Sequence, residues 1–165
     1  MRIVAFKRKD GPGLAVRQGK DLVDLAVAAP KLPRELAALL ATKGGLQAAK
    51  AAAKAAKAKA FVKGKVTYLP TVMAPPKIIC VGLNYVDHAA ESPYKNAPTY
   101  PVLFNRFNST LLAHNAPLIR PLCSEQFDYE GELVAVIGKR GRHISPEKAL
   151  AYVAGYTVFN DASVR

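Results

Sequence analysis

The sequence has little of what stabilises small secreted proteins or stacks on nucleic-acid bases. It contains no Trp, an aromatic share of 8%, and two cysteines, Cys80 and Cys123, without a CxxC spacing. Two isolated thiols are typical of ordinary buried cysteines in a cytosolic protein and not of a disulfide framework. No apolar run is long enough for a signal-peptide core or for the roughly 20 residues that span a bilayer. We therefore expect a soluble, cytoplasmic protein.

Acidic residues are also scarce, with 12 Asp and Glu against 24 Lys and Arg and a formal net charge of +12. Residues 43–65 hold seven lysines and no acid, which leaves +5 for the rest of the chain. A basic excess gathered in one Ala/Lys segment is typical of a solvated helix face. The aromatic side chains of a base-stacking platform are missing, so nucleic-acid binding is not expected. A basic binding module without catalytic activity remains the alternative to the enzyme described below.

The first part of the chain has the pattern of a β-hairpin. Apolar stretches at residues 2–8 and 14–17 lie on either side of Asp10-Gly-Pro-Gly13, which predicts a turn. Residues 21–25 predict a third strand.

Two helices are expected to follow. The first begins near Pro33, continues through Leu40 and ends at Gly44-Gly45. The second covers the Ala/Lys residues 46–60, and we expect loose packing because alanine buries little area. Together these elements predict a small α+β module over residues 1–70.

A change of composition at Pro70, Pro75 and Pro76 predicts a second, β-rich domain over residues 71–165. A helix is expected to start at Ser145-Pro146. Strands, three of them with a buried pattern, are predicted at residues 77–83, 101–104, 132–137 and 152–160.

Two glutamates in this domain give the first chemical signal. Glu130 and Glu132 are two residues apart, so on a strand their side chains point to the same face. Adjacent carboxylates repel each other unless a cation lies between them, and all-oxygen ligands favour Mg²⁺, Ca²⁺ or Mn²⁺ over zinc. The alternative is an alternating strand whose two glutamates both face water.

One histidine and two further acidic residues add to the evidence for a catalytic metal site. His88 and Glu91 are three residues apart and hence neighbours on a helix. A carboxylate beside an imidazole raises its basicity, which suits a general base acting on water; an ordinary surface pair is the alternative. Asp161, after Asn160, supplies either a third carboxylate or a turn.

The order of these segments resembles the fumarylacetoacetate hydrolase family, over about residues 77–165. Each motif is weak alone, but the ordered set is specific. The motifs are Gly82-x-Asn84-Tyr85-x-x-His88-x-x-Glu91, then Asp128-Tyr-Glu-Gly-Glu-Leu133 with Val136-Ile-Gly138, then Gly155-Tyr156 and Asn160-Asp161-x-Ser163-x-Arg165.

The resemblance implies a site and a reaction. Glu130, Glu132 and Asp161 would hold Mg²⁺ or Mn²⁺, and His88 with Glu91 would activate water. The implied reaction is hydrolysis of a C–C bond in a 2,4-diketo acid or related 2-oxo-enoate from aromatic catabolism. Sister enzymes isomerise or decarboxylate instead.

Substrate binding is implied for two arginines. Arg165 falls where the family places a group that contacts the substrate or the developing oxyanion. Arg106 stands where many members have a lysine.

The implied fold is α+β and β-rich: a small N-terminal module followed by a mixed β-sandwich roll, usually dimeric. The roll is incomplete here, because the family continues beyond the Arg165 motif with an Asp, a lysine and further strands. Unpaired strand edges and exposed apolar faces are therefore expected. We expect residues 1–165 to belong to a longer enzyme; a split enzyme and a degenerate product are the alternatives.

Overall fold

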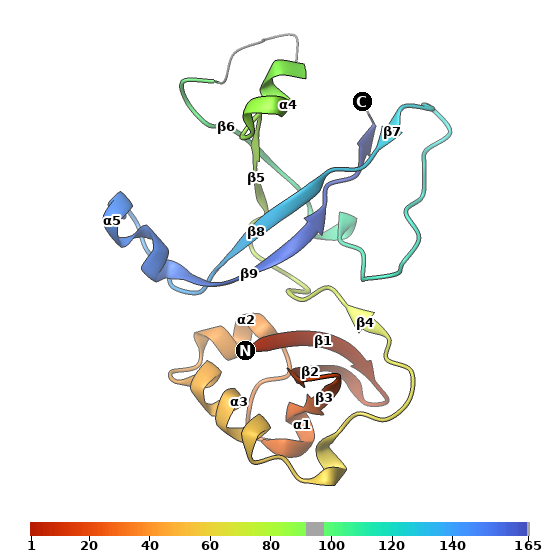
Figure 1. Ribbon diagram of the computed structural model, residues 1–165, viewed down its shortest axis with the longest axis vertical. Coiled ribbons are helices and arrows are strands. Elements are labelled where there is room, and N and C mark those ends of the chain that lie inside the picture. The colour runs from red at the N-terminus through yellow and green to blue at the C-terminus, as the bar shows by residue number, and fades with distance from the viewer. Residues whose placement is uncertain (92–97, 165) are drawn as a thin grey trace. The chain divides into compact units, whose positions relative to one another are not determined.

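The computed structural model describes residues 1–91 and 98–164, without the side chain of Glu91 (Figure 1). The chain divides into two units, one of residues 1–72 with 112–165 and one of residues 73–111. Helices and strands both contribute, which confirms the α+β class. The division expected from the sequence, between residues 70 and 71, groups the chain differently and stays a prediction.

The N-terminal sheet has the strand order β3-β2-β1-β4 and is entirely antiparallel. It confirms the predicted hairpin and third strand. Its strands are β1 (Arg2–Arg8), β2 (Gly11–Gln18), β3 (Asp21–Asp24) and β4 (Tyr68–Leu69).

The turn of the hairpin is tighter than the sequence suggested. Arg8 pairs with Gly11, so only two residues connect β1 and β2, and Pro12 lies within the strand. Gly11 has a φ of 118°, a backbone conformation that favours glycine. The proline is tolerated because β3 pairs with β2 only from Ala15 onward, which leaves this end of β2 on an edge. The expected turn is therefore present but lies at residues 9–10, and Gly11–Gly13 belong to β2.

Three helices cover this sheet: α1 (Leu25–Ala28), α2 (Leu36–Ala41) and α3 (Gly45–Lys54) (Figure 1). The α1 helix was not predicted, and α2 begins three residues after Pro33. The predicted 46–60 helix ends at Lys54 and is followed by the 3₁₀ helix η1 (Ala58–Ala60), after which Phe61 bridges to Val23.

The core of this region is fully enclosed. Leu14, Val23 and Leu39 are at most 1% exposed. Ala49 and Ala53 of α3 are buried in the same cluster. The expected loose packing of this helix is therefore wrong, because the small alanine side chains allow α3 to approach the core closely.

The unit of residues 73–111 contains β5 (Ile79–Gly82), α4 (Val86–Glu91), β6 (Val102–Asn105) and the 3₁₀ helix η2 (Asn108–Thr110). Strands β5 and β6 pair antiparallel. Both strands were predicted, but the predicted burial is wrong: Ile79 is 60% and Leu103 is 62% exposed. A two-stranded sheet has few neighbours to cover its faces.

The other unit continues with a long antiparallel hairpin of β8 (Gly131–Ile137) and β9 (Val153–Asn160). The helix α5 (Pro146–Ala149), with Ser145 at its N-cap, and the 3₁₀ helix η3 (Leu150–Tyr152) lie between the two strands, so the predicted helix start is confirmed. Two short strands, β7 (Phe127–Asp128) and β10 (Ser163–Val164), pair beside the open end of the hairpin.

Candidate metal and catalytic site

The three predicted metal ligands lie in the backbone at the open end of the β8–β9 hairpin. Gly131 pairs with Asn160, and Glu132 pairs with Phe159. The pair of Gly131 with Asn160 is the end of the ladder. One residue beyond it, the backbone N–H of Asp161 donates to the carbonyl oxygen of Glu130 at 2.8 Å. Opposed residues of an antiparallel pair share a face, and so do residues two apart on one strand. The backbone therefore brings Glu130, Glu132 and Asp161 to one end and one face.

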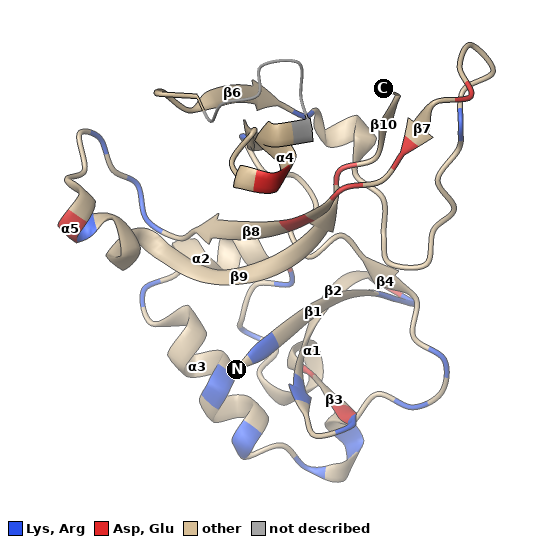
Figure 2. Cartoon of the chain, turned by 45° about the horizontal axis from the view of Figure 1, so that its top comes forward, with Lys and Arg blue, Asp and Glu red and all other residues tan. Residues whose placement is uncertain are grey.

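Hydrogen bonds and burial distinguish this junction from an ordinary solvated turn. The Glu130 backbone N–H donates to Oδ1 of Asn160 at 3.2 Å, so the Asn160 side chain joins the two strands. Asp161 is 3% exposed, and the two glutamates are half-buried. Figure 2 shows acidic positions at the β7–β8 junction, at the start of β8 and between β9 and β10. The alternative with both glutamates fully in water does not hold here.

The donor set suits a hard divalent cation, because three carboxylates offer only oxygen ligands. As the side chains stand, no group of three or more His, Cys, Asp or Glu within residues 1–91 and 98–164 is arranged to hold a metal. Convergence of the three carboxylates on one ion therefore stays a prediction.

The predicted base lies on another element. His88 is half-buried on α4, directly before the buried Ala89. A sharp turn connects β5 to this helix, and Leu83 within it has a φ of 53°. Such a conformation is uncommon for a branched side chain and is found more often at functional sites. His88 and the carboxylates belong to different units, so their proximity stays a prediction.

Two predicted site groups cannot be placed. The side chain of Glu91 and the whole of Arg165 lie outside the described residues. Their roles in activating water and in contacting the substrate stay predictions.

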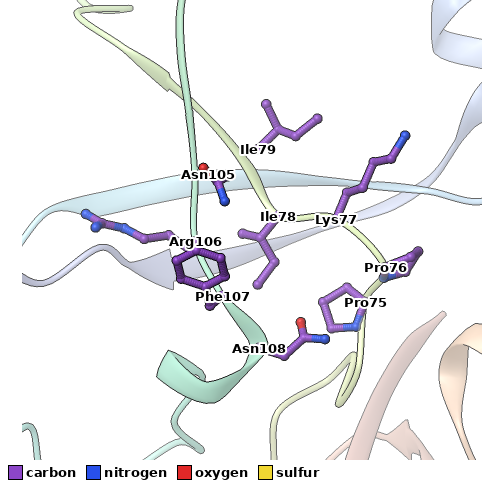
Figure 3. Close-up of a pocket in the computed structure, with 9 residues that line it drawn as sticks. All are labelled: Pro75, Pro76, Lys77, Ile78, Ile79, Asn105, Arg106, Phe107 and Asn108. Carbon is purple, nitrogen blue, oxygen red and sulfur yellow. The ribbon is translucent and has the colours of Figure 1, made fainter.

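Arg106 lines a pocket of about 260 Å³ within the unit of residues 73–111 (Figure 3). Its guanidinium lies 5.2 Å from the centre of the Phe104 ring, and its backbone N–H donates to the Ile78 carbonyl. Lys77 also lines the pocket, but Figure 3 shows the two cationic side chains extending away from each other. The pocket therefore has no converging pair of cations for a carboxylate. The amides of Asn105 and Asn108, which the sequence analysis did not single out, complete its polar lining.

Comparison with known proteins identifies the fold and the family. The fold is that of solved enzymes, including maleylpyruvate hydrolase from Sphingobium, in complex with manganese and pyruvate (TM-score 0.74, 24% identity, 100% of this chain and 60% of that chain). A 5-carboxymethyl-2-hydroxymuconate delta-isomerase from Mycobacterium smegmatis is similar as well (TM-score 0.63, 25% identity, 100% of this chain and 55% of that chain). The family model described as fumarylacetoacetate hydrolase C-terminal matches residues 77–165. The chain belongs to the fumarylacetoacetate hydrolase family.

A curated relative extends the similarity to the N-terminal module. Oxaloacetate tautomerase fahd2 of Xenopus laevis, named as mitochondrial, is 36% identical over 100% of this chain and 53% of its own length. The chain thus spans about half the length of that relative. In the described part of the chain, no helix has the length and apolarity needed to cross a membrane. The expected cytoplasmic location stays a prediction.

Proposed function

We propose that this chain supplies the metal-binding carboxylates of an enzyme that acts on small 2-oxo acids through their enol or enolate forms. The observation behind this proposal is the backbone pairing of Glu130 with Asp161, with Glu132 on the same face. These three residues would hold Mg²⁺ or Mn²⁺. A cation bound there would polarise the 2-oxo group and stabilise the charge of an enolate.

Keto–enol tautomerisation is the favoured reaction, because the Xenopus relative named for it is 36% identical over the whole chain. The reaction needs a base that removes a proton from the carbon beside the carbonyl. His88 is the candidate, since an imidazole exchanges protons near neutral pH. In the hydrolysis described next, the same side chain would act on water instead of carbon.

Hydrolysis of a C–C bond in a 2,4-diketo acid is the second candidate, supported by the motif order from His88 to Asp161. His88, oriented by Glu91, would take a proton from water, and the water oxygen would attack the distal carbonyl. The C–C bond beside that carbonyl would then break, releasing a carboxylic acid and the enolate of the 2-oxo acid, which would take back a proton from His88. Arg106 and Arg165 would bind the substrate's carboxylate or the developing oxyanion. Either reaction is proposed for a full-length enzyme acting as a homodimer.

Metal binding tests the carboxylate site without requiring turnover. Mn²⁺ should raise the melting temperature of the wild-type chain, because a ligand that binds only the folded state stabilises it. Asp161→Asn should remove this rise. Asp128→Asn is the matched control: it deletes the charge of an exposed nearby aspartate and should respond to Mn²⁺ like the wild type. Equal responses from all three chains would refute the site.

Activity tests the role of His88. Loss of the enol form of oxaloacetate and cleavage of an acylpyruvate should be followed in the full-length enzyme with Mg²⁺, with EDTA and after His88→Ala. We expect EDTA and His88→Ala each to lower the rate by about two orders of magnitude or more. Rates indifferent to Mg²⁺, EDTA and the substitution would refute the proposed chemistry.

A further inference from the structure

The positive charge of the chain is concentrated in its N-terminal module. Residues 1–72 contain fifteen Lys and Arg against four acids, a net charge of +11. Residues 73–165 contain nine against eight, a net charge of +1. Figure 2 shows Lys and Arg along α3 and in the loops around the N-terminal strands. The basic excess therefore lies apart in sequence from the proposed metal ligands, and the proposed function does not explain it.

A pocket of about 470 Å³ lies within this module, which is the size of many small-molecule sites. It lies among the end of β1, the β1–β2 turn, Asp24 and residues 62–66. The last segment is held at both ends: Val62 N–H donates to the Leu22 carbonyl at 2.9 Å, and Lys7 N–H donates to that of Thr67 at 2.8 Å. This side of the pocket is thus formed by a segment whose two ends are hydrogen-bonded to β1 and β3.

Two aspartates and Arg8 line this pocket, and together with Arg34, which does not line it, they neutralise one another. Arg8 forms ion pairs with Asp10 and with Asp24, and the Arg8 side chain is 19% exposed. Arg34 binds the other oxygen of Asp10 at 2.7 Å. Because their charges are already paired, these four residues leave the charge of the pocket to its lysines.

Four lysines belong to the lining of this pocket: Lys7, Lys9, Lys63 and Lys65. Lys7 contributes its backbone side, because it lies between Phe6 and Arg8 on β1 and its side chain therefore points to the other face of the sheet. All four are exposed, and none forms an ion pair with an acid in the described residues. Lys9, Lys63 and Lys65 therefore leave unbalanced positive charge at one pocket, and a multivalent anion would neutralise it. Lysine binds phosphate as a point charge, without the paired geometry that arginine uses.

We propose that this pocket binds a small molecule carrying a chain of two or three phosphates, held by Lys9, Lys63 and Lys65. Val62 and Val66, which pack on the buried Phe6, also line the pocket and offer apolar surface to the organic part of such a molecule. A membrane surface is disfavoured because the apolar face of α3 is buried in the core of the module, so this helix has no apolar face to insert. A nucleic acid is disfavoured because aromatic side chains do not alternate with the lysines.

Calorimetric titration of the full chain with inorganic tripolyphosphate tests the proposal. We expect saturable binding of one molecule per chain that weakens as salt is added. The double substitution Lys63→Gln with Lys65→Gln should weaken binding on the order of tenfold, since each exposed charge contact is worth up to about fivefold.

Lys50→Gln with Lys54→Gln is the matched control, because it removes the same charge from exposed positions on α3 that do not line the pocket. It should weaken binding by less than about twofold, the size of a weak exposed charge contact. Circular dichroism melting should show both double variants folded. If the two double substitutions weakened tripolyphosphate binding equally, the attraction would be diffuse and the proposed site would be refuted. Binding of several tripolyphosphates per chain, or no saturable binding, would also refute it.

Discussion

At the residue scale, two neighbouring arginines hold the carboxyl group of Asp10 in its ionised form. Hydrogen bonds from Arg8 and then from Arg34 lower its pKa from 3.8 to about 2. Both donors are cationic and therefore favour the ionised carboxylate. Carbon NMR titration of the Asp10 carboxyl group should give a midpoint of about 2. Arg34→Gln should raise that pKa toward 3.8, whereas Lys31→Gln, an exposed charge removed nearby, should leave it unchanged.

The ion pair of Asp10 with Arg34 predicts that the stability of the protein depends on pH. The pKa of Asp10 is lower in the folded chain than its ordinary value of 3.8, so its stabilising contribution is complete above 3.8 and is lost as the pH falls through about 2. The melting temperatures of the wild type and Arg34→Gln should therefore differ at neutral pH and converge near pH 2. A difference that stays constant down to that pH would contradict the assignment.

The sequence predicted some of these residue contacts and not others. Glu130 and Glu132 are two residues apart, so their shared face follows from strand periodicity. The pairing of Asp161 with Glu130 joins positions that are distant in sequence, and only the motif order of the family indicated it. The contact of Asp10 with Arg34 joins a turn to the segment before α2, and no local pattern encodes such a pair.

At the element scale, the β8–β9 hairpin has two apolar faces with different environments. Val136 is half-buried on the face that carries Glu132, whereas Val158 is 84% exposed on the opposite face. Thr has nearly the shape of Val but adds a hydroxyl. Val136→Thr should lower the local opening free energy of the hairpin by about 1 kcal/mol, because it places a polar group in a partly apolar site. Amide hydrogen exchange of Val134 and Thr157 would measure this change.

Val158→Thr is the matched substitution on the other face. It should change the local opening free energy by less than about 0.5 kcal/mol, because exposed substitutions rarely do more. A loss as large as that of Val136→Thr would show that something covers this face in solution, such as a second copy of the chain. That outcome would contradict the exposure described for the single chain.

Strands were more predictable than helix ends. The strands over residues 2–8, 132–137 and 152–160 occur where their apolar patterns indicated. The Ala/Lys helix ends six residues early, because Ala60 is buried and Phe61 pairs with Val23. Tertiary contacts outweigh the high helix propensity of this segment.

At the scale of the whole molecule, apolar burial is divided unequally along the chain. Among the described residues, 13 of the 14 buried hydrophobic side chains belong to residues 5–60. The described residues also include 21 large hydrophobic side chains that are exposed, and 20 of these lie after residue 78. The exposed apolar faces expected from the sequence are thus present, and they lie in the part that matches the family model. The N-terminal module, by contrast, has a closed core of its own.

This asymmetry predicts that the module folds by itself. A chain of residues 1–72 should unfold cooperatively at a temperature within about 5 °C of the main transition of the full chain, a shift worth about 1 kcal/mol in a domain of this size. Leu39, which is 0% exposed, gives the control. Leu39→Ala should lower the unfolding free energy of both chains by about 3 kcal/mol, because it leaves a cavity in the same core. If calorimetry showed no cooperative transition for residues 1–72, the module would depend on residues 112–165 of its unit for stability, and the basic pocket would then have to be regarded as a property of the whole unit.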